Sequence, residues 1–84
     1  MTITVKFFAA LREQVGRDCI DIVVGERGDI AGLLANIREM IGDGAFAALS
    51  APNVRVAVNK QFVDRDAAVR DGDEVAFMPP ITGG

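Results

Sequence analysis

The sequence predicts an α+β domain in which a mixed sheet of four to five strands packs on one main helix. Segments in which polar and apolar residues alternate, as is typical of strands with one wet face, lie near both ends of the chain. Between them, apolar residues recur at helical spacing from Ile30 to Ile41. The chain has 84 residues, of which 50% are hydrophobic, so it is long enough for one ordered domain and no more.

The N-terminal part of the chain predicts two strands joined by a short helix. Residues 2–8 alternate polar and apolar side chains and predict a half-buried strand. Residues 9–15 predict a short helix that Gly16 closes. Residues 19–24 are rich in β-branched side chains and predict a second strand, which we expect to pair with the first as a hairpin.

The central segment predicts the main helix. Asp29 is a suitable N-cap, because its carboxylate can accept a hydrogen bond from a backbone N–H of the first turn. Gly42 is expected to end the helix, and residues 45–49 are expected to add a short helical piece. The apolar stripe of this helix consists of Ile30, Leu33, Leu34, Ile37, Met40 and Ile41.

The C-terminal part predicts three more extended segments. Residues 54–59 and 74–78 alternate and predict strands, and residues 62–63 predict a short extended piece after a turn. Pro79 and Pro80 have no backbone N–H and are expected to end the pairing in the sheet. This order of elements fits the β-grasp fold. Besides the helix stripe, the expected core consists of Ile3, Val5, Phe7, Val54, Val56, Val58, Val75 and Phe77.

Composition excludes several classes of function. The net charge is −3, so neither nucleic acid nor an anionic membrane is expected as a partner. The chain has one Cys and no His, which predicts no metal site and no disulfide within the chain. No apolar run approaches the roughly 20 residues of a membrane-spanning helix, and no signal peptide is evident. A cytoplasmic location is therefore expected.

The C-terminal end is the strongest local signal for function. Residues 1–80 are expected to form the domain, and residues 81–84 a flexible tail that projects from it. Gly83 and Gly84 have no Cβ, so they form the thinnest segment that can enter a pocket and leave a terminal carboxylate sterically open. Glycine is also common in frayed chain ends. The residues alone therefore leave both a reactive and a passive tail open.

Other candidate residues have simpler structural explanations. Cys19 has no histidine to activate it, and we expect it to be a small filler or an edge residue of a strand. Asp71, Asp73 and Glu74 surround Gly72, which predicts a solvated turn rather than an acid–base site.

Exposed apolar side chains predict a docking surface. In the alternation of the first and last strands, Phe8 and Met78 occupy solvent-facing positions. Ala57 in the segment 54–59 and Ala76 in the segment 74–78 also occupy solvent-facing positions. The first and last strands are neighbours in a β-grasp sheet, so these residues would form one patch, which Phe62 could join. Burying each large side chain on a partner contributes about 1.5–3 kcal/mol. The alternative is that Phe8 turns inward where the strand becomes helix.

Motifs at both ends of the chain carry a resemblance to a known family. They are Phe7-Phe8-Ala9-Ala10-Leu11-Arg12-Glu13 with Gly16, then Val58-Asn59, then Asp71-Gly72-Asp73-Glu74-Val75-Ala76-Phe77, and finally Pro79-Pro80-Ile81-Thr82-Gly83-Gly84. In this order and at this spacing they resemble the MoaD-like sulfur carriers, the small subunits of molybdopterin synthase, which have the ubiquitin-like β-grasp fold. Ile81 stands where valine is frequent in that family, and Met78 where an aromatic residue is frequent.

The resemblance implies that the carboxylate of Gly84 is the reactive group. A ubiquitin-activating-like enzyme that uses ATP would adenylate Gly84, and a sulfur donor protein would convert it into a thiocarboxylate. The sulfur would pass to the cyclic pyranopterin monophosphate precursor in the active site of the large synthase subunit, in a heterotetramer. The chain itself would then bind no cofactor and be no enzyme alone, because the large subunit supplies the catalytic side chains of this transferase. The implied partner-binding residues are Phe8, Phe62, Met78, Pro80, Ile81 and Thr82, with Gly83 in the tail.

Three alternatives stay open at this point. The chain could be a sulfur carrier for thiamine thiazole synthesis. It could also be a ubiquitin-like protein modifier, joined through Gly84 to lysines of its targets. The third alternative is a non-catalytic β-grasp interaction module with a passive tail.

Overall fold

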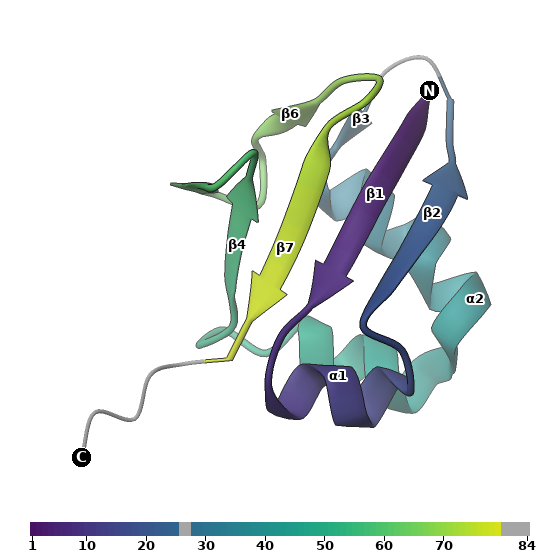
Figure 1. The fold of residues 1–84 in the computed structure, drawn as a ribbon, viewed down its shortest axis with the longest axis vertical. Coiled ribbons are helices and arrows are strands. Elements are labelled where there is room, and N and C mark those ends of the chain that lie inside the picture. The colour runs from purple at the N-terminus through teal and green to yellow at the C-terminus, as the bar shows by residue number, and fades with distance from the viewer. Residues whose placement is uncertain (26–27, 80–84) are drawn as a thin grey trace.

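The structure, a computed structural model, describes residues 1–25 and 28–79. Its elements in chain order are β1 (Thr2–Phe7), α1 (Ala10–Val15), β2 (Cys19–Val23), β3 (Gly28–Asp29), α2 (Ile30–Leu49), β4 (Arg55–Val58), β5 (Gln61–Val63), β6 (Ala68–Val69) and β7 (Glu74–Met78) (Figure 1). The main sheet has five strands in the order β2-β1-β7-β4-β5. β7 runs parallel to β1, and the other pairs are antiparallel. This mixed sheet with one main helix confirms the predicted β-grasp architecture.

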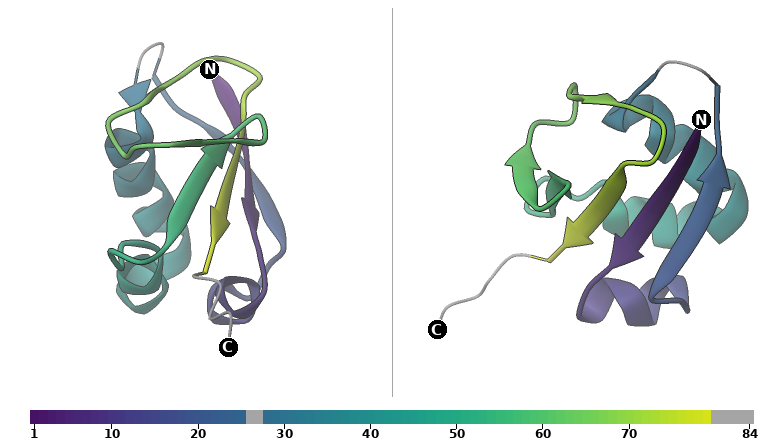
Figure 2. Two further views of the ribbon diagram at one scale, coloured as in Figure 1. Left: turned by 90° about the vertical axis from the view of Figure 1, so that its left-hand side faces the viewer. Right: turned by 45° about the horizontal axis from the view of Figure 1, so that its top comes forward.

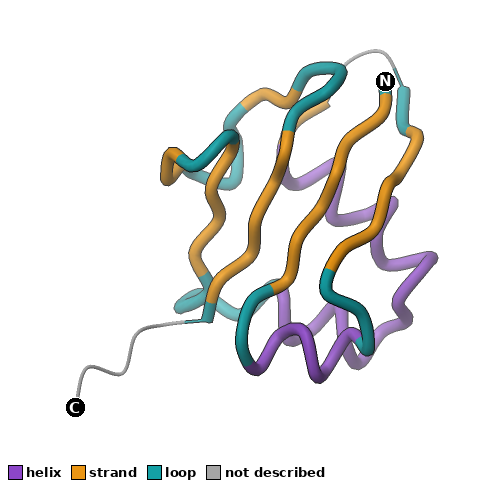
Figure 3. The backbone as a smooth tube through the Cα atoms, in the orientation of Figure 1, coloured by secondary structure: helices purple, strands orange, loops and turns teal. Residues whose placement is uncertain are grey.

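One face of the main sheet is buried against α2, because the apolar positions of each strand share one parity. The strands form a single layer and α2 crosses behind them (Figures 2 and 3). The sheet contributes Ile3, Val5, Phe7, Ile20, Ile22, Val56, Val75 and Phe77 to the core, and α2 contributes Ile30, Leu33, Leu34, Ile37 and Leu49. All the predicted core positions of the strands are buried except Val58, which is half-buried and packs at the margin of this core.

The main helix begins and breaks where the sequence predicts. Asp29 Oδ1 accepts a hydrogen bond from the backbone N–H of Gly32 at 2.8 Å, so Asp29 is the N-cap. Gly42 has φ 85° and ψ 170°, which no residue inside a helix adopts, and a second helical piece follows it. None of the helices in residues 1–25 and 28–79 is long and apolar enough to cross a membrane.

The prediction that Met40 belongs to the buried stripe is wrong. Its side chain is 48% exposed, whereas Ile37 is fully buried and Ile41 half-buried. At about 100° per residue, position 40 lies about 60° around the helix from position 37 and about 20° beyond position 33, at the edge of the stripe. Met40 therefore lies at the edge of the apolar stripe, next to the edge strand β2.

A second, two-stranded sheet escaped the sequence-based prediction. β3 and β6 pair antiparallel, with Gly28 opposite Val69 and Asp29 opposite Ala68. Each strand has two residues, which is too short for any alternation to be visible. This small sheet joins the start of α2 to the segment that precedes β7.

Candidate functional site

The candidate site lies on the outer face of the main sheet, which points away from α2. The strand register places Lys6 opposite Ala76, Ala76 opposite Ala57, and Ala57 opposite Phe62. Paired residues point to the same face of a sheet, so these four side chains form one row across β1, β7, β4 and β5.

A second row lies one step closer to the end of β7. Met78 pairs with Arg55 of β4. On the other side, the backbone N–H of Phe8 donates to the carbonyl oxygen of Phe77 at 3.1 Å, so Phe8 continues the pairing of β1 with β7. Phe8 is 44% exposed, and the alternative that it turns inward is wrong. We call Lys6, Phe8, Arg55, Ala57, Phe62, Ala76 and Met78 together the outer-face patch.

The structure thus brings Phe8, Phe62 and Met78 to the same face, although they come from three separate segments. Phe62 is 55% exposed, and Met78 is half-buried between its neighbours. Their role in binding a partner stays a prediction. Pro80, Ile81, Thr82, Gly83 and Gly84, together with the predicted domain boundary and tail, lie outside the described residues.

Arg55 is a member of the patch that sequence reasoning missed. Its Cζ lies 3.7 Å from the centroid of the Phe62 ring, which is a cation–π contact. At an exposed site this contact contributes about 0.5–1 kcal/mol, and it holds the Phe62 ring in place on the short edge strand β5. The alternation of residues 54–59 places Arg55 at a solvent-facing position, and this could have been seen in the sequence. Its position beside Met78 and Phe62, however, depends on the register between the strands.

Ala57 and Ala76 are less exposed than their solvent-facing positions in the strands predict. They are 4% and 8% exposed, respectively, although they lie on the outer face. Their larger neighbours, including Phe62 and Met78, shield them from solvent. A partner that docks on this face would therefore contact mainly the larger side chains around the two alanines.

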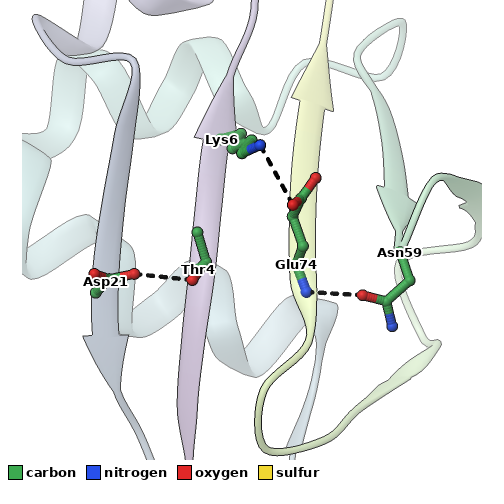
Figure 4. Close-up of polar contacts among 5 residues, drawn as sticks. All are labelled: Thr4, Lys6, Asp21, Asn59 and Glu74. Atoms are coloured by element: carbon green, nitrogen blue, oxygen red, sulfur yellow. Dashed lines mark hydrogen bonds and ion pairs between the residues drawn. The ribbon is translucent and has the colours of Figure 1, made fainter.

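Polar contacts bound the patch on the side away from the end of β7 (Figure 4). Lys6 Nζ lies 3.3 Å from Glu74 Oε2, and Thr4 Oγ1 donates to Asp21 Oδ1 at 2.9 Å. The backbone N–H of Glu74 donates to Asn59 Oδ1 at 3.0 Å. The side chains of the Lys6–Glu74 pair are 42% and 33% exposed, and such surface pairs stabilise a fold little. The outer face therefore carries its large apolar side chains near Met78, together with Arg55, and is polar beyond Lys6.

The carboxylates after residue 70 hold a turn, as predicted. Asp71 Oδ1 accepts from the backbone N–H of Thr2 at 2.7 Å, and Asp73 Oδ2 accepts from that of Arg70 at 2.8 Å. Gly72 has φ 85°, a conformation that favours glycine. Cys19 is exposed on the edge strand β2, opposite Lys6, which is consistent with the edge position expected for it.

Comparisons with known proteins cover nearly the whole chain. The model of the ThiS family matches residues 5–84. Two curated relatives, from Haemophilus influenzae and Escherichia coli, are each 39% identical to the chain, and each match covers 98% of this chain and 99% of the relative. Both relatives are named molybdopterin synthase sulfur carrier subunit.

Solved structures share the fold over the full length. SAMP1 from Haloferax volcanii superposes with a TM-score of 0.80 at 24% identity, and the match covers 100% of both chains. A chain from the complex of subunits 1 and 2 of the molybdopterin-converting factor of Helicobacter pylori gives a TM-score of 0.70 at 22% identity, again with 100% of both chains covered. On the family match and the two curated relatives together, this chain belongs to the ThiS family of β-grasp proteins.

Proposed function

We propose that this protein is the sulfur carrier subunit of a molybdopterin synthase, acting as a non-catalytic small subunit. The observation that carries the proposal is the 39% identity to two relatives of that name over nearly their whole length. The ThiS family match supports the carrier role. The likeness to a chain from a two-subunit molybdopterin-converting factor supports a larger subunit as the partner, in the heterotetramer that the sequence resemblance implies.

Under this proposal the chemistry takes place at the carboxylate of Gly84. A carboxylate is ionised near neutral pH and is a poor electrophile. On a separate activating enzyme, the carboxylate oxygen attacks the α-phosphorus of ATP, pyrophosphate leaves, and an acyl-adenylate forms. A hydrosulfide equivalent from the sulfur donor protein then attacks the acyl carbon, the bond to the AMP oxygen breaks, and Gly84 carries a thiocarboxylate.

The second half of the proposed cycle returns the carrier to its starting state. The thiocarboxylate sulfur attacks a side-chain carbon of the cyclic pyranopterin monophosphate precursor in the active site of the large subunit, the bond from that carbon to its oxygen breaks, and that oxygen leaves, so that a thioester joins the carrier to the pterin. Water then attacks the acyl carbon, the carbon–sulfur bond breaks, and the carboxylate of Gly84 is restored while the sulfur stays on the pterin. By the family resemblance, the catalytic side chains for these steps belong to the large subunit, and this chain, which contains no histidine, contributes its terminus.

The outer-face patch is the proposed docking surface for the large subunit. Ordering residues 81–84 in a partner's active site costs about 1–2 kcal/mol of backbone entropy per residue. Burying Phe8, Phe62 and Met78 contributes about 1.5–3 kcal/mol each, which is of the same size as that cost. The patch surrounds Met78, where β7 ends, so contacts there would place the segment that follows next to the partner.

The decisive experiment is the intact mass of the protein isolated from its native cell. We expect a fraction heavier by one oxygen-to-sulfur exchange, with the difference assigned to Gly84 by fragmentation. The matched control is a variant that lacks Gly83 and Gly84. It should bind a molybdopterin synthase large subunit but form no thiocarboxylate and no pterin product. A truncated variant that still supports pterin sulfuration would refute the proposal.

Sulfur transfer to a thiazole is the second candidate, because the matching family model carries the ThiS description. The two candidates predict different acceptors for the same thiocarboxylate. Carrier loaded at Gly84 is therefore offered separately to a molybdopterin synthase large subunit and to a thiazole synthase. Sulfur transfer to the thiazole synthase alone would favour the second candidate, and isopeptide-linked adducts in cells would favour a protein modifier.

A further inference from the structure

A second exposed surface lies at the edge of the main sheet opposite β5. Val23 is 79% exposed and Met40 48% exposed, and neither belongs to the outer-face patch. Between β2 and α2 runs a groove that we call the edge groove. It is lined by Asp21, Ile22, Val23, Asn36, Glu39 and Met40.

The backbone of β2 offers unpaired hydrogen-bonding groups along this groove. The bonds from Val24 N to Met1 O and from Phe7 N to Asp18 O, both 2.9 Å, show that the even-numbered residues of this segment bond to β1. In an antiparallel pair the alternate residues point their N–H and C=O groups the other way. These groups of Cys19, Asp21 and Val23 therefore face away from β1, where no strand of residues 1–25 and 28–79 pairs with them.

Such an edge is a template on which an extended chain can add a strand. The side chains of an added strand alternate between the two sides of the sheet. On the outer side they would lie beside Asp21 and Val23, and on the helix side beside Glu39 and Met40. Each side of the edge groove thus presents one carboxylate and one exposed apolar side chain.

We propose that the edge groove binds an extended segment of a partner protein, which adds to β2 as a further strand and carries Lys or Arg together with aliphatic side chains. The two carboxylates select the basic side chains by charge complementarity, and Val23 and Met40 provide contact for the aliphatic ones. This chemistry differs from that of the outer-face patch, which has Lys6 and Arg55 at its rim. The inference does not rest on the proposed function.

A second copy of this chain suits the edge groove poorly in the register centred on Asp21. If β2 paired with β2 of another copy about a two-fold axis centred on Asp21, the two Asp21 carboxylates would lie opposite each other. Like charges directly opposite each other destabilise a strand pair. In this register the acidic edge therefore disfavours self-association, while it favours a basic strand.

The test uses the full chain, nitrogen-labelled for NMR, and the acetylated and amidated peptide Thr-Val-Val-Lys-Lys-Thr. In an extended conformation this peptide presents one Val and one Lys on each side. We expect peptide-dependent shifts at Asp21, Val23 and Met40. We also expect slower amide exchange at Cys19, Asp21 and Val23, with no change at Ile20 and Ile22, whose amides already bond to β1.

Two controls separate strand addition from unspecific binding. Peptides N-methylated on the amides that would face β2 should lose binding. Peptides N-methylated on the amides that would face away from β2 should keep it. Replacement of both peptide lysines by glutamate should abolish the shifts. In the protein, Glu39→Lys should weaken binding about three- to tenfold, because it reverses one exposed charge of the groove without touching β2.

Three results would overturn the proposal. The first is the absence of shifts at millimolar peptide, which is the weak limit of specific recognition. The second is binding that is insensitive to the side of N-methylation, because no backbone ladder would then form. The third is slow exchange of the Cys19, Asp21 and Val23 amides in the free protein that depends on protein concentration, which would make a second copy the occupant.

Discussion

At the scale of single residues, the structure gives charged side chains two different tasks. Arg55 lies on the surface and orients Phe62 by stacking on its ring. Arg65 is half-buried and holds the chain where α2 ends, since its Nη2 lies 3.1 Å from the carbonyl oxygen of Leu49 and 3.2 and 3.1 Å from those of Ala51 and Val54. The last carbonyls of a helix have no partner within the helix, so Arg65 stabilises the fold by supplying one.

Replacing Arg65 is therefore expected to destabilise the domain. Arg65→Met should lower the free energy of unfolding by about 1.5–3 kcal/mol, because it removes hydrogen bonds from a charged donor to half-buried carbonyls. Urea denaturation measures this change. Arg70→Met, at an exposed arginine, is the matched control and should change stability by less than about 0.5 kcal/mol. Equal effects of the two substitutions would show that the hydrogen bonds of Arg65 do not stabilise the fold.

The outer-face patch gives a second prediction at this scale. Phe8→Asp and Met78→Lys should each weaken binding to a molybdopterin synthase large subunit by about tenfold or more, because each loses an apolar contact of at least about 1.4 kcal/mol. Titration calorimetry with the purified subunits measures the effect. Val23→Asp, which changes a more exposed apolar residue outside the patch, should leave this affinity unchanged. If all three variants bind alike, the patch is not the interface.

At the scale of elements, the ends and breaks of the two helices depend on unusual backbone angles. Ala9 precedes α1 with φ 53° and ψ −128°, a region that residues other than glycine rarely adopt. In α2, Gly42 adopts φ 85° without strain, and Arg38 reaches across this break to Asp43 and to the ring of Phe46. The two helical pieces are thus joined by side chains as well as by the backbone.

Relief of the strain at Ala9 should stabilise the protein. Ala9→Gly removes a positive-φ cost of about 1–2 kcal/mol and adds glycine's entropic cost of about 0.5–1 kcal/mol. We expect a net gain of about 0.5–1 kcal/mol, measured by thermal and urea unfolding. Ala10→Gly, one residue later at the start of α1, should instead lower stability by up to about 1 kcal/mol. A loss of stability with both variants would mean that the Ala9 backbone is not strained.

The contact across the helix break makes a prediction about pH. Arg38 Nε donates to Asp43 Oδ1 at 2.7 Å, and this hydrogen bond, followed by the charge of the guanidinium, lowers the pKa of the Asp43 carboxyl. A carboxyl whose pKa is lowered in the folded state stabilises the fold above its unfolded pKa and loses this effect as the pH falls through the folded pKa. Asp43→Asn should therefore lose less stability on acidification below the ordinary aspartate pKa than the parent protein. Identical pH profiles of unfolding would contradict this.

At the scale of the whole molecule, the fold separates two surfaces of different chemistry. The outer-face patch gathers around the end of β7, and the edge groove lies along β2 and α2, on the opposite side of β1 (Figure 1). The inner face of the sheet is closed by α2 and contributes the core. Asp21 of the edge groove also lies at the polar boundary of the patch, but the two surfaces share no other residue, so a partner that covers the patch alone would leave the edge groove accessible.

Simultaneous binding at the two surfaces is the resulting prediction. The Thr-Val-Val-Lys-Lys-Thr peptide should bind the preformed complex with a molybdopterin synthase large subunit as tightly as it binds the free chain, within about twofold. Fluorescence anisotropy of the labelled peptide measures both affinities. Competition between the peptide and the large subunit would show that the two surfaces overlap. The Glu39→Lys variant should bind the peptide about three- to tenfold more weakly and keep its affinity for the large subunit.

The sequence by itself determined the local features of this protein. The strand parity of Ile3, Val5 and Phe7, the cap at Asp29 and the break at Gly42 all follow from residues close together along the chain. The same holds for the motifs that identified the family, since they are short and occur in a set order. Met40 was misassigned because a helical stripe has no sharp margin until a neighbouring element defines it.

The tertiary structure alone decided what lies beside what. Arg55 reaches Phe62 and Met78, and Ala57 and Ala76 are shielded, because β4, β5 and β7 pair in one particular register. The two-residue strands β3 and β6 pair where the start of α2 bonds to the segment before β6, from Ile30 N to Ala67 O and from Ala31 N to Arg65 O. Register depends on contacts between residues far apart in the chain, and no local pattern encodes such contacts. For the same reason the edge groove appears only when β2 and α2 are seen side by side.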